Sequence, residues 1–434
     1  MSLKKNALAT VALTGIAVAV SSAYAAGFQL TEQSSLGLGR AFAGAGIVGD
    51  DLSAVFYNAA GMTLLPGTQI QAGSVYIDVD APLNNTQGQQ IENGRLVGQA
   101  IPAGYITHQV NDQLWLGLGM TVPYGLGTEY GATWGNFEGA KKGNQSMVMT
   151  IDINPNIAWK VSDKLSVGAG ISLQYAKAEL GQVKYMPVAT GVNESTGAVE
   201  YTMMNNDVVV KGDSWHCGFN LGLMYQPTET LRFGLSYRSQ IGHNAEGEAK
   251  AEAYYPGTTM IVGQKFSNDF KVRVTTPDTV MATTTWEATP DLRLSGLVRW
   301  ARWSNLDELH IQAFGNTSVN EYRWDDTWLF SVGADYRLNN EWTVRGGLAY
   351  ETGAINEEEY RTATIPDVDR VWFSLGATYH YSKQIQIDFA GTYLMGVGNM
   401  DLYSEKDANG QRYKMAEFDS LDAFVIGAQV QYRF

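Results

Sequence analysis

Residues 371–389 read VWFSLGATYHYSKQIQIDF, and this stretch decides the fold. Every second residue from Val371 to Tyr381 is apolar or aromatic, and most of the residues between them are small or polar. After the short break Ser382-Lys383 the alternation resumes as far as Phe389. A period of two is typical of a strand with one apolar face, and a two-residue break is typical of a hairpin. The stretch predicts two antiparallel strands and a tight turn.

The connections along the rest of the chain are alternately short and long. Five further short ones are Val110-Asn111-Asp112, Ser162-Asp163-Lys164, Pro227-Thr228-Glu229, Pro290-Asp291 and Asn339-Asn340-Glu341. Between them lie polar, glycine-rich connections of roughly 15 to 30 residues, which is long for ordinary loops. Short turns at one end and long loops at the other indicate an outer-membrane β-barrel.

Alternation of this kind predicts fourteen strands, an even number as bacterial barrels have. They are residues 67–80, 99–110, 113–123, 146–161, 164–178, 208–226, 229–246, 267–288, 291–303, 322–338, 341–352, 369–381, 384–398 and 418–434. Their inner faces are polar and their outer faces apolar, which is the correct arrangement in lipid. A soluble β-sandwich is the alternative reading of the same alternation.

The N-terminal end of the chain and its composition support the assignment to outer-membrane β-barrels. Residues 1–25 are predicted to be a secretory signal peptide that is cleaved after Ala23-Tyr24-Ala25. No later apolar run reaches the ~18 residues of a membrane helix. The net charge of −14 argues against a nucleic-acid partner. A single cysteine, Cys217, excludes an intramolecular disulfide, and we expect no metal and no cofactor.

Residues 26–66 do not show the alternation of a strand. They are rich in Gly, Ala and Ser, and they are too apolar for a disordered tail. A barrel of fourteen strands is wide enough to leak, so we predict that this segment is a hatch, or plug. The predicted fold class is all-β: a 14-stranded antiparallel transmembrane β-barrel (residues 67–434) with an N-terminal hatch inside the lumen.

Four motifs carry a resemblance to a known family. They are Gly27-Phe28-Gln29-Leu30, residues 34–44 (SSLGLGRAFAG), residues 56–62 (FYNAAGM) and residues 123–130 (PYGLGTEY). These motifs resemble the FadL/TodX family of outer-membrane channels for long-chain fatty acids and hydrocarbons. The resemblance covers essentially the whole mature chain.

The resemblance implies where substrate binds and leaves. The implied hatch residues near the substrate are Phe28, Leu30, Asn58, Ala59 and Ala60. The implied lateral opening is a strand kink at Val122, Pro123, Tyr124 and Gly125, where Pro123 cannot donate a ladder hydrogen bond.

The chain departs from the family pattern at two places. The family's Asn-Pro-Ala motif is Asn58-Ala59-Ala60 in this chain, which leaves the hatch more backbone freedom. The family's basic residue late in the fifth strand corresponds to Gln182, with Lys177 and Lys184 nearby. The loss of this charge weakens the case for a fatty acid relative to an uncharged hydrophobic substrate.

An extracellular groove is predicted in loops 179–207 and 247–266, because flexible methionines and aromatic residues suit adaptable apolar binding. Its candidate residues are Tyr185, Met186, Met203, Met204, Tyr254, Tyr255, Met260 and Ile261. The alternative is that these residues only pack the loops together.

The predicted function is passive uptake of hydrophobic compounds through the outer membrane of a Gram-negative bacterium. Substrate is captured in the groove, the hatch rearranges, and the substrate exits laterally through the barrel wall. The first candidate substrate is a long-chain fatty acid, and the alternative is a neutral aromatic or aliphatic hydrocarbon. The expected partners are this small molecule and outer-membrane lipid, and the protein is expected to be a monomer and not an enzyme. A lipase or protease, a hydrophilic porin and an adhesin or phage receptor remain as competing functions.

Overall fold

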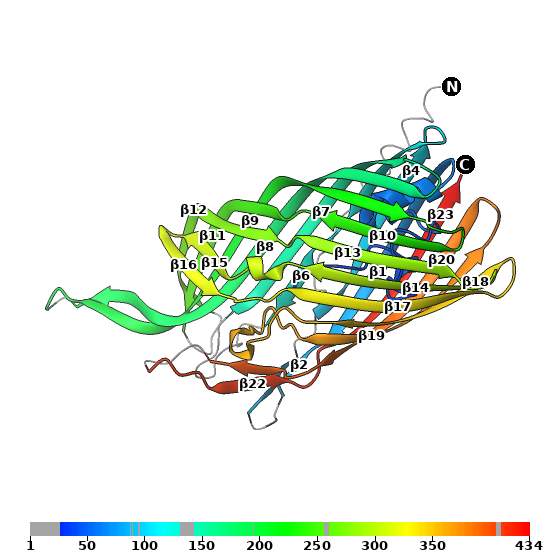
Figure 1. Ribbon diagram of the computed structural model, residues 1–434. Coiled ribbons are helices and arrows are strands. Elements are labelled where there is room, and N and C mark those ends of the chain that lie inside the picture. The colour runs from blue at the N-terminus through cyan, green and yellow to red at the C-terminus, as the bar shows by residue number, and fades with distance from the viewer. Residues whose placement is uncertain are drawn as a thin grey trace.

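The computed structural model describes residues 27–86, 88, 90–93, 96–130, 143–193, 195–255, 260–404 and 409–434. The predicted signal peptide lies outside these residues. Figure 1 shows strands that run obliquely around one long barrel, with the C-terminus at one end. None of the helices in the described ranges is long and apolar enough to cross a membrane.

Seventeen strand segments form the barrel wall. They are β1 (Thr68–Asp80), β4 (Leu96–Gln109), β5 (Leu114–Thr121), β6 (Gly125–Glu129), β7 (Gly143–Lys160), β8 (Leu165–Val192), β9 (Val199–Tyr225), β10 (Leu231–Arg238), β11 (Ile241–Tyr254), β12 (Ile261–Thr276), β13 (Thr279–Glu287), β14 (Leu292–Ala301), β17 (Thr327–Arg337), β18 (Trp342–Glu351), β19 (Asp369–His380), β20 (Ile385–Val397) and β23 (Asp422–Arg433).

The closed 14-stranded antiparallel barrel is confirmed. Fourteen strands account for the seventeen segments because β5 with β6, β10 with β11, and β12 with β13 each continue one another along the wall. The barrel closes where β1 pairs with β23 on one side and with β4 on the other. The predicted boundary at residue 67 lies one residue before β1.

The two ends of the barrel differ as the connections predict, and we call them the turn end and the loop end. At the turn end, a side-chain oxygen of the turn caps the following strand. For example, Asn111 Oδ1 accepts from the amides of Gln113 and Leu114, at 2.9 and 3.0 Å, and Asn339 Oδ1 accepts from Glu341 and Trp342. Such Asx turns fix the hairpin register locally.

The loop end carries more regular structure than predicted. The predicted loops 179–207 and 247–266 are largely strand, because β8 pairs with β9 from Leu165↔Tyr225 to Val192↔Val199 and β11 pairs with β12 from Ile241↔Thr276 to Tyr254↔Ile261. Figure 1 shows the β8–β9 hairpin projecting far beyond the wall. A hairpin can satisfy its own backbone hydrogen bonds, so a long polar connection need not be irregular.

Six short strands complete the loop end. They are β2 (Pro82–Asn85), β3 (Gln90–Asn93), β21 (Asp401–Tyr403) and β22 (Lys414–Phe418), which form a separate four-stranded sheet, and the hairpin of β15 (Glu308–Ala313) and β16 (Asn316–Glu321), which joins the wall at β12. The short helices η2 (Trp303–Asn305) and η3 (Glu358–Tyr360) also lie in these connections.

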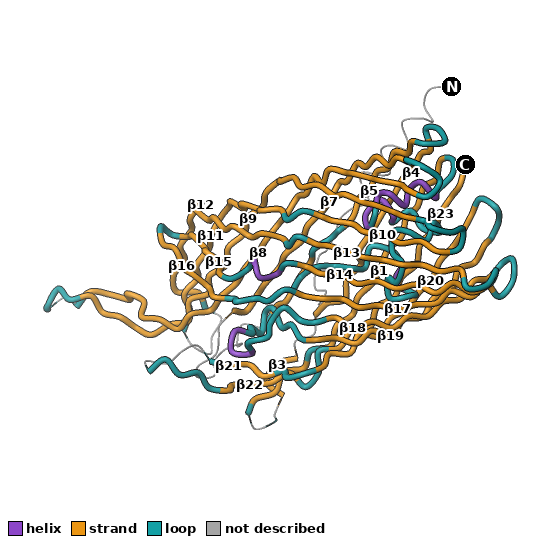
Figure 2. The backbone as a smooth tube through the Cα atoms, viewed as in Figure 1, coloured by secondary structure: helices purple, strands orange, loops and turns teal. Residues whose placement is uncertain are grey.

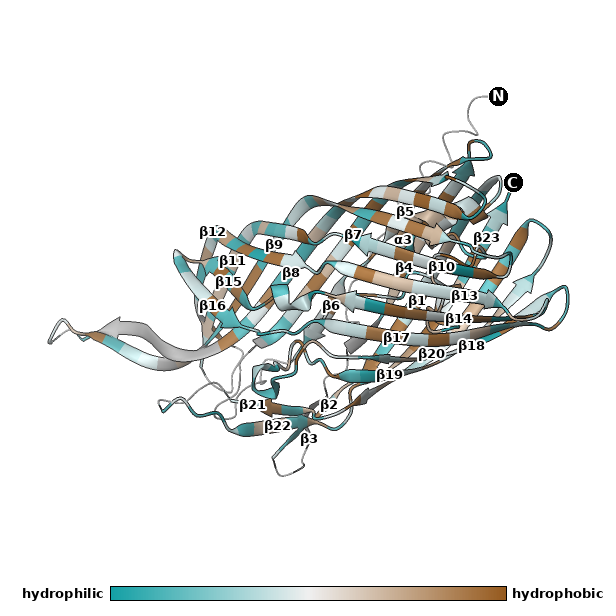
Figure 3. Cartoon of the chain, viewed as in Figure 1, coloured by the Kyte–Doolittle hydropathy of each residue, from teal (hydrophilic) through white to brown (hydrophobic). Residues whose placement is uncertain are grey.

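Side chains alternate across the wall in the sense that lipid requires. On β20 and β23, Phe389 and Ile426 are exposed, whereas Asp388 and Gln429 point inward and are buried. Figure 3 shows the same alternation of apolar and polar residues along the strands. Only an apolar medium on the outside makes this arrangement favourable.

The lumen is filled by residues 27–65, which we call the N-terminal segment. It contains α2 (Ser35–Leu38), α3 (Ala54–Tyr57) and η1 (Ala59–Leu64). Figure 2 shows these helices enclosed by strands near the C-terminal end of the barrel. Almost all described side chains of the segment are buried, although the barrel around them opens at both ends.

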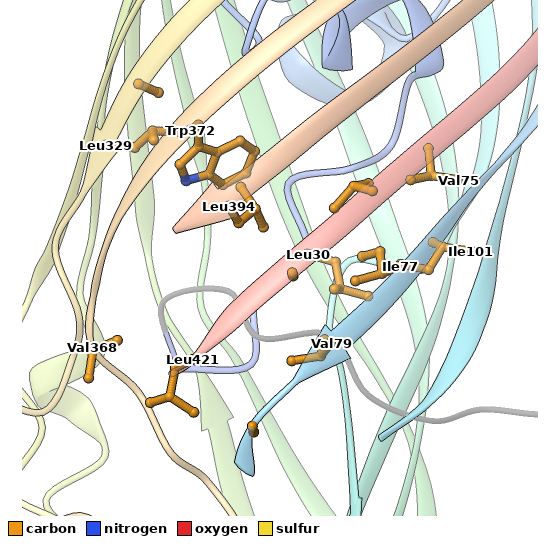
Figure 4. Close-up of a cluster of buried hydrophobic side chains, with 14 of the residues drawn as sticks. Leu30, Val75, Ile77, Val79, Ile101, Leu329, Val368, Trp372, Leu394 and Leu421 are labelled. Carbon is orange, nitrogen blue, oxygen red and sulfur yellow. The ribbon is translucent and has the colours of Figure 1, made fainter. Parts of the chain in front are cut away.

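One part of the inner wall is apolar, in contrast to the polar inner faces that the alternation predicts. Val75, Ile77 and Val79 of β1 point inward and are buried together with Leu30 and Ile101. Figure 4 shows these side chains on one side of the lumen and Leu329, Trp372 and Leu394 on the other. Leu30 belongs to the N-terminal segment. The inward apolar side chains of β1 are favourable at this place because they are buried against this apolar residue of the segment.

Candidate functional site

The barrel wall is interrupted at Val122-Pro123-Tyr124, between β5 and β6. β4 pairs with β5 only from Gly104↔Met120 to Gln109↔Trp115. Among the described residues, β6 pairs with β7 and has no strand pairing with β4. The predicted opening residues, Val122 to Gly125, therefore form a break in the wall, as expected where a proline removes a ladder donor.

The start of the N-terminal segment completes this break. Leu30 N–H donates to the Pro123 carbonyl oxygen at 2.8 Å, and Gly125 N–H donates to the Phe28 carbonyl oxygen at 3.0 Å. Gln29 and Tyr124 form an antiparallel bridge between these two bonds. Residues 28–30 thus act as a short substitute strand at the place where β6 lacks a partner.

Gln33 fixes the same break through its side chain. Its Oε1 accepts from the Val122 amide at 3.2 Å, and its Nε2 donates to the carbonyl oxygens of Val122 at 2.7 Å and Leu30 at 3.2 Å. The amide group of Gln33 therefore occupies the position of a neighbouring peptide group. The sequence gives no signal for this role, because it depends on a contact between residues far apart in the chain.

Phe28 is held among three aromatic residues, Tyr124, Trp303 and Trp324, which we call the aromatic box. The ring centroid of Phe28 lies 4.7 Å from that of Trp303, 5.9 Å from Trp324 and 6.0 Å from Tyr124. All four side chains are buried. The two tryptophans were not among the predicted site residues, since they come from loop-end connections without a motif.

Leu30 points to the other side of the segment, into an inner cavity. Phe42, Phe56, Tyr57, Leu297 and Leu329 also line this cavity, whose free volume is about 50 Å³. Small-molecule sites usually measure about 300–1,000 Å³. The N-terminal segment must therefore move before this cavity can hold a long-chain molecule.

A much larger groove lies at the loop end, with a free volume of about 630 Å³. Its apolar lining includes Leu180, Val208, Val210, Ile311, Phe314 and Tyr322. Among the described residues that line it, Arg412 is the only cationic one and Glu321 the only acidic one. Gln182 lies in the lining at the position where the family resemblance implies a base. We call this space the loop-end groove.

Arg412 is held at the rim of the loop-end groove by Tyr360 and Glu359. Its guanidinium carbon lies 4.8 Å from the centroid of the Tyr360 ring, and its Nη1 donates to the Glu359 carbonyl oxygen at 2.7 Å. The side chain is only 12% exposed. Its Nε is buried and makes no hydrogen bond with the described residues, but it lies 3.8 Å from a carboxylate oxygen of Glu359.

Five of the eight predicted groove residues lie outside the loop-end groove. Met204 and Tyr254 are buried, and Tyr255, Met260 and Ile261 are exposed; none of these five lines the loop-end groove. The side chains of Tyr185, Met186 and Met203 lie outside the described part of the chain.

Asn58, Ala59 and Ala60 anchor the N-terminal segment to the wall. Asn58 Nδ2 donates to the Leu223 carbonyl oxygen at 3.0 Å, and its Oδ1 accepts from the Ala60 amide at 3.1 Å. Both alanines are fully buried, and they pack so close to Gly168 that a Cβ at that glycine would lie 2.5 Å from the Ala60 nitrogen. The structure therefore places this motif at an anchor, and Asn58 also lines the inner cavity.

A second anchor is a buried ion-pair network toward the turn end. Arg40 contacts Asp50 at 2.9 Å and Asp335 of β17 at 3.4 Å. Arg293 contacts Asp50 at 3.1 Å, and Arg345 contacts Asp335 at 3.0 Å. Burial raises the pKa of Asp50, but the guanidinium groups of Arg40 and Arg293 outweigh burial and hold this pKa well below its usual range.

Glu32 is the least satisfied charged residue of the N-terminal segment. It is buried, and neither carboxylate oxygen makes a hydrogen bond with the described residues. Desolvation, followed by repulsion from Glu351, raises the pKa of Glu32 to about 7. Its neighbours Thr31 and Gln33 bond to Arg299 and Val122, so an unpaired carboxyl lies between two attachment points.

A β-barrel with an interrupted wall, a filled lumen and an apolar groove at its loop end defines a class of membrane channel. The model of the family described as "Outer membrane protein transport protein (OMPP1/FadL/TodX)" matches residues 16–434. The chain belongs to this family, as its N-terminal motifs indicate, and it resides in the outer membrane of a Gram-negative bacterium. The family consists of transport proteins and not of enzymes.

Individual relatives agree with this assignment. The chain is 29% identical to "Outer membrane protein P1" of Haemophilus influenzae, over 88% of this chain and 89% of that protein. It is 28% identical to a "Long-chain fatty acid transport protein" of Escherichia coli O6:H1, over the full length of both. The fold is also that of a solved FadL homologue of Pseudomonas aeruginosa (TM-score 0.80, 23% identity, 94% of this chain and 100% of that one). A Pseudomonas putida toluene transporter, TodX, has the same fold (TM-score 0.71, 17% identity, 94% and 100%).

Proposed function

We propose that the protein is a passive channel that admits long-chain fatty acids by capture in the loop-end groove, movement of the N-terminal segment and lateral exit at the wall break. The observation that carries this proposal is that residues 28–30 complete the wall break. One movement of the segment start would then enlarge the inner cavity and open the wall. Residues 26–66 would serve as the movable hatch.

Lateral exit fits the energetics of the cargo. Each buried CH₂ group contributes about 0.8 kcal/mol, so releasing a chain of sixteen carbons into water costs on the order of 12 kcal/mol. A route from an apolar groove through the wall into lipid avoids most of this cost. The apolar inner surface of Val75, Ile77 and Leu30 supports such a route.

The loop-end groove has the size for a fatty acid, and its described lining holds one cation, Arg412, besides the carboxylate of Glu321. Its volume of about 630 Å³ lies within the usual range for small-molecule sites, and the loop end of an outer-membrane barrel faces the outside. Arg412 would contact the carboxylate while the alkyl chain lies along Leu180 and Val208. A relative with full-length similarity is named a long-chain fatty acid transport protein, which supports this choice.

A second candidate is uptake of neutral hydrocarbons. Gln182, at the position where the family has a base, is uncharged and lines the groove. Solved relatives of the same fold include channels named for toluene and for monoaromatic hydrocarbons. Uptake of each compound class by cells that lack their own channel distinguishes the two candidates.

A cysteine lock at the break tests the proposed mechanism. In a Cys217→Ser background, Gln29→Cys with Tyr124→Cys places two thiols on bridged partners. We expect oxidation to abolish uptake of a long-chain fatty acid and reduction to restore it, because the lock ties the segment to the wall.

The control pair is Leu235→Cys with Ala282→Cys, two lipid-facing partners of β10 and β13. Oxidation should leave uptake by this variant unchanged. Equal uptake by the oxidised and reduced Gln29/Tyr124 variant would rule out opening at this break.

A further inference from the structure

We propose that the aromatic box binds a substrate ring that carries a hydrogen-bond acceptor, and that Phe28 occupies this site while the wall is closed. The inference rests on the proposed function, in which the start of the N-terminal segment moves. It adds, beside the long-chain fatty acids, a second substrate class that the box itself would prefer: aromatic compounds with an oxygen acceptor, such as aryl ketones, ethers or carboxylates.

The box has the geometry of a ring-binding site. The ring of Phe28 stands edge-to-face on Trp303 at 67° and on Tyr124 at 66°, and Trp303 and Trp324 meet at 72° with their centroids 5.1 Å apart. Edge-to-face contacts are the favoured arrangement of aromatic pairs. Three rings therefore enclose one guest ring, which at present is the side chain of the protein's own Phe28.

The box also contains two unused donors. The indole Nε1 atoms of Trp303 and Trp324 are buried and make no hydrogen bond with the described residues. A buried tryptophan usually finds a partner for its N–H, and Phe28 cannot supply one. A ligand ring with an oxygen substituent fills the same space and pairs at least one donor, which a hydrocarbon ring or an alkyl chain cannot do.

Phe28 is attached in a way that allows it to leave. Gly27 precedes it with φ +67°, and a Cβ there would lie 2.6 Å from Trp324 and 2.9 Å from Trp303. On the other side, the Phe28 carbonyl accepts one hydrogen bond from Gly125. One residue earlier, the Gly27 amide also donates to the buried Asp367 carboxylate at 3.1 Å. The ring is thus placed by a close-fitting glycine and two backbone hydrogen bonds, not by a covalent anchor.

The position of the box connects the two ends of the proposed route. Tyr322 lines the loop-end groove, and its ring lies 5.9 Å from that of Trp324. Tyr124 belongs to the wall break. Val210, Tyr322, Trp324, Phe28 and Tyr124 form part of one continuous apolar cluster, so a ring in the box lies between the groove and the opening.

The test compares acetophenone with ethylbenzene, two rings of similar size of which only acetophenone has an acceptor. The Phe28→Ala substitution in the full-length protein vacates the box. The protein is labelled with 5-fluorotryptophan, and ¹⁹F NMR follows the resonance of Trp324 as ligand is added. This resonance is assigned as the signal that disappears in Trp324→Phe. We expect acetophenone to bind about three- to tenfold more tightly than ethylbenzene, the value of one neutral hydrogen bond. Phe28→Leu, with heat-shifted gel mobility as the folding check, serves if Phe28→Ala does not fold.

Replacing donors separates this inference from general hydrophobic binding. In the Phe28→Ala protein, Trp303→Phe combined with Trp324→Phe should remove the preference for acetophenone, as followed by its uptake, while ethylbenzene uptake persists. Trp115→Phe is the control, because the Trp115 indole donates to the Leu65 carbonyl oxygen outside the box. Equal affinities of the two ligands would overturn the inference. Fatty-acid uptake by the wild-type protein is measured in parallel, so that failure of the box and failure of the proposed function are told apart.

Discussion

At the scale of single residues, Arg412 distinguishes the two candidate substrate classes. It is the one cation among the described residues that line the loop-end groove. Its buried Nε makes no hydrogen bond within the described part of the chain and lies 3.8 Å from the Glu359 carboxylate. A charge-assisted hydrogen bond to a carboxylate contributes about 1.5–3 kcal/mol. The charge of Arg412 should therefore matter for an acid and not for a hydrocarbon.

Arg412→Gln is expected to weaken binding of a long-chain fatty acid about tenfold or more, as measured by uptake against concentration. Uptake of the alkane of the same length should not change. Lys265→Gln, a cation over the ring of Phe314 but absent from the groove lining, is the control. An equal loss for acid and alkane would show that Arg412 acts through packing rather than charge.

Glu32 should make the stability of the N-terminal segment depend on pH. Its pKa is about 7 in the folded protein, against an ordinary value of 4.5. Below pH 4.5 the carboxyl is protonated in both the folded and the unfolded protein, so its shifted pKa does not change stability. As the pH rises toward 7, the folded state loses up to about 3 kcal/mol of stability relative to the unfolded state. This loss should be absent in Glu32→Gln.

The measurement is hydrogen exchange of the N-terminal segment from pH 4.5 to 8, corrected for the intrinsic exchange rate. Wild-type protein should lose protection across this interval, and Glu32→Gln should retain it. Glu341→Gln, in an exposed turn, should behave like the wild type. If Glu32→Gln loses protection as the wild type does, the carboxyl does not control the segment.

At the scale of elements, the break between β5 and β6 is a strand edge that another part of the same chain pairs with. Unpaired strand edges are normally covered or paired, and here the cover consists of residues 28–30 and Gln33. Because the cover is short and non-covalent, the edge can be exposed without disturbing the pairing of β6 with β7.

Gln33→Leu should loosen this cover. The substitution leaves the Val122 amide and carbonyl unpaired, and each such group costs about 1–3 kcal/mol when buried. We expect faster hydrogen exchange at Leu30 and a faster initial rate of fatty-acid uptake. Gln431→Leu, which removes a buried amide bonded to Gln69, should leave both rates unchanged. Slower uptake by Gln33→Leu would mean that the side chain assists opening.

At the scale of the whole molecule, the N-terminal segment is firmly held at its middle and end, which together we call its base. It is lightly held at its start. Arg40 and Asp50 attach its middle to β14 and β17 through buried ion pairs, and Asn58 attaches its end to β9. The start is attached through hydrogen bonds, both at the break and between Gly27 and Asp367 and between Thr31 and Arg299. Movement should therefore be confined to the start, while the rest of the segment continues to fill the lumen.

Arg40→Met is expected to release the base. Removing one partner of a buried ion pair typically costs about 3–5 kcal/mol, so the variant should conduct ions in planar bilayers where the wild type does not, with its barrel still folded. Lys271→Met, which breaks an exposed pair with Glu246, should remain closed. A closed Arg40→Met channel would assign the seal to other contacts.

The sequence predicted the barrel because strand alternation and turn length are local properties. The turns at Asn111 and Asn339 cap their own strands. The exposure of Phe389 and Ile426 follows from the alternation within their own strands and does not depend on any distant residue. The wall break was predicted at Val122 to Gly125 from the family resemblance, together with the local effect of Pro123 on strand pairing. The loops 179–207 and 247–266 were wrong as loops, since polarity alone does not distinguish a solvated hairpin from irregular chain.

The candidate site was harder to predict because it is made of long-range contacts. Trp303 and Trp324 meet Phe28 across about three hundred residues of chain, and Arg412 reaches the groove from the last long connection. Neither the two tryptophans nor Arg412 lies in a motif. Their roles follow from the closure of the barrel, which no local pattern specifies.

The division between base and start has a consequence for the permeability of the cell envelope. If only the first residues of the segment move, the charged part of the lumen remains blocked during each uptake event, and the path that opens leads sideways into lipid. Water-soluble antibiotics and bile salts outside the cell would then gain no aqueous route from this protein. We expect a bacterium to be able to produce it in large amounts for nutrition without weakening its outer barrier.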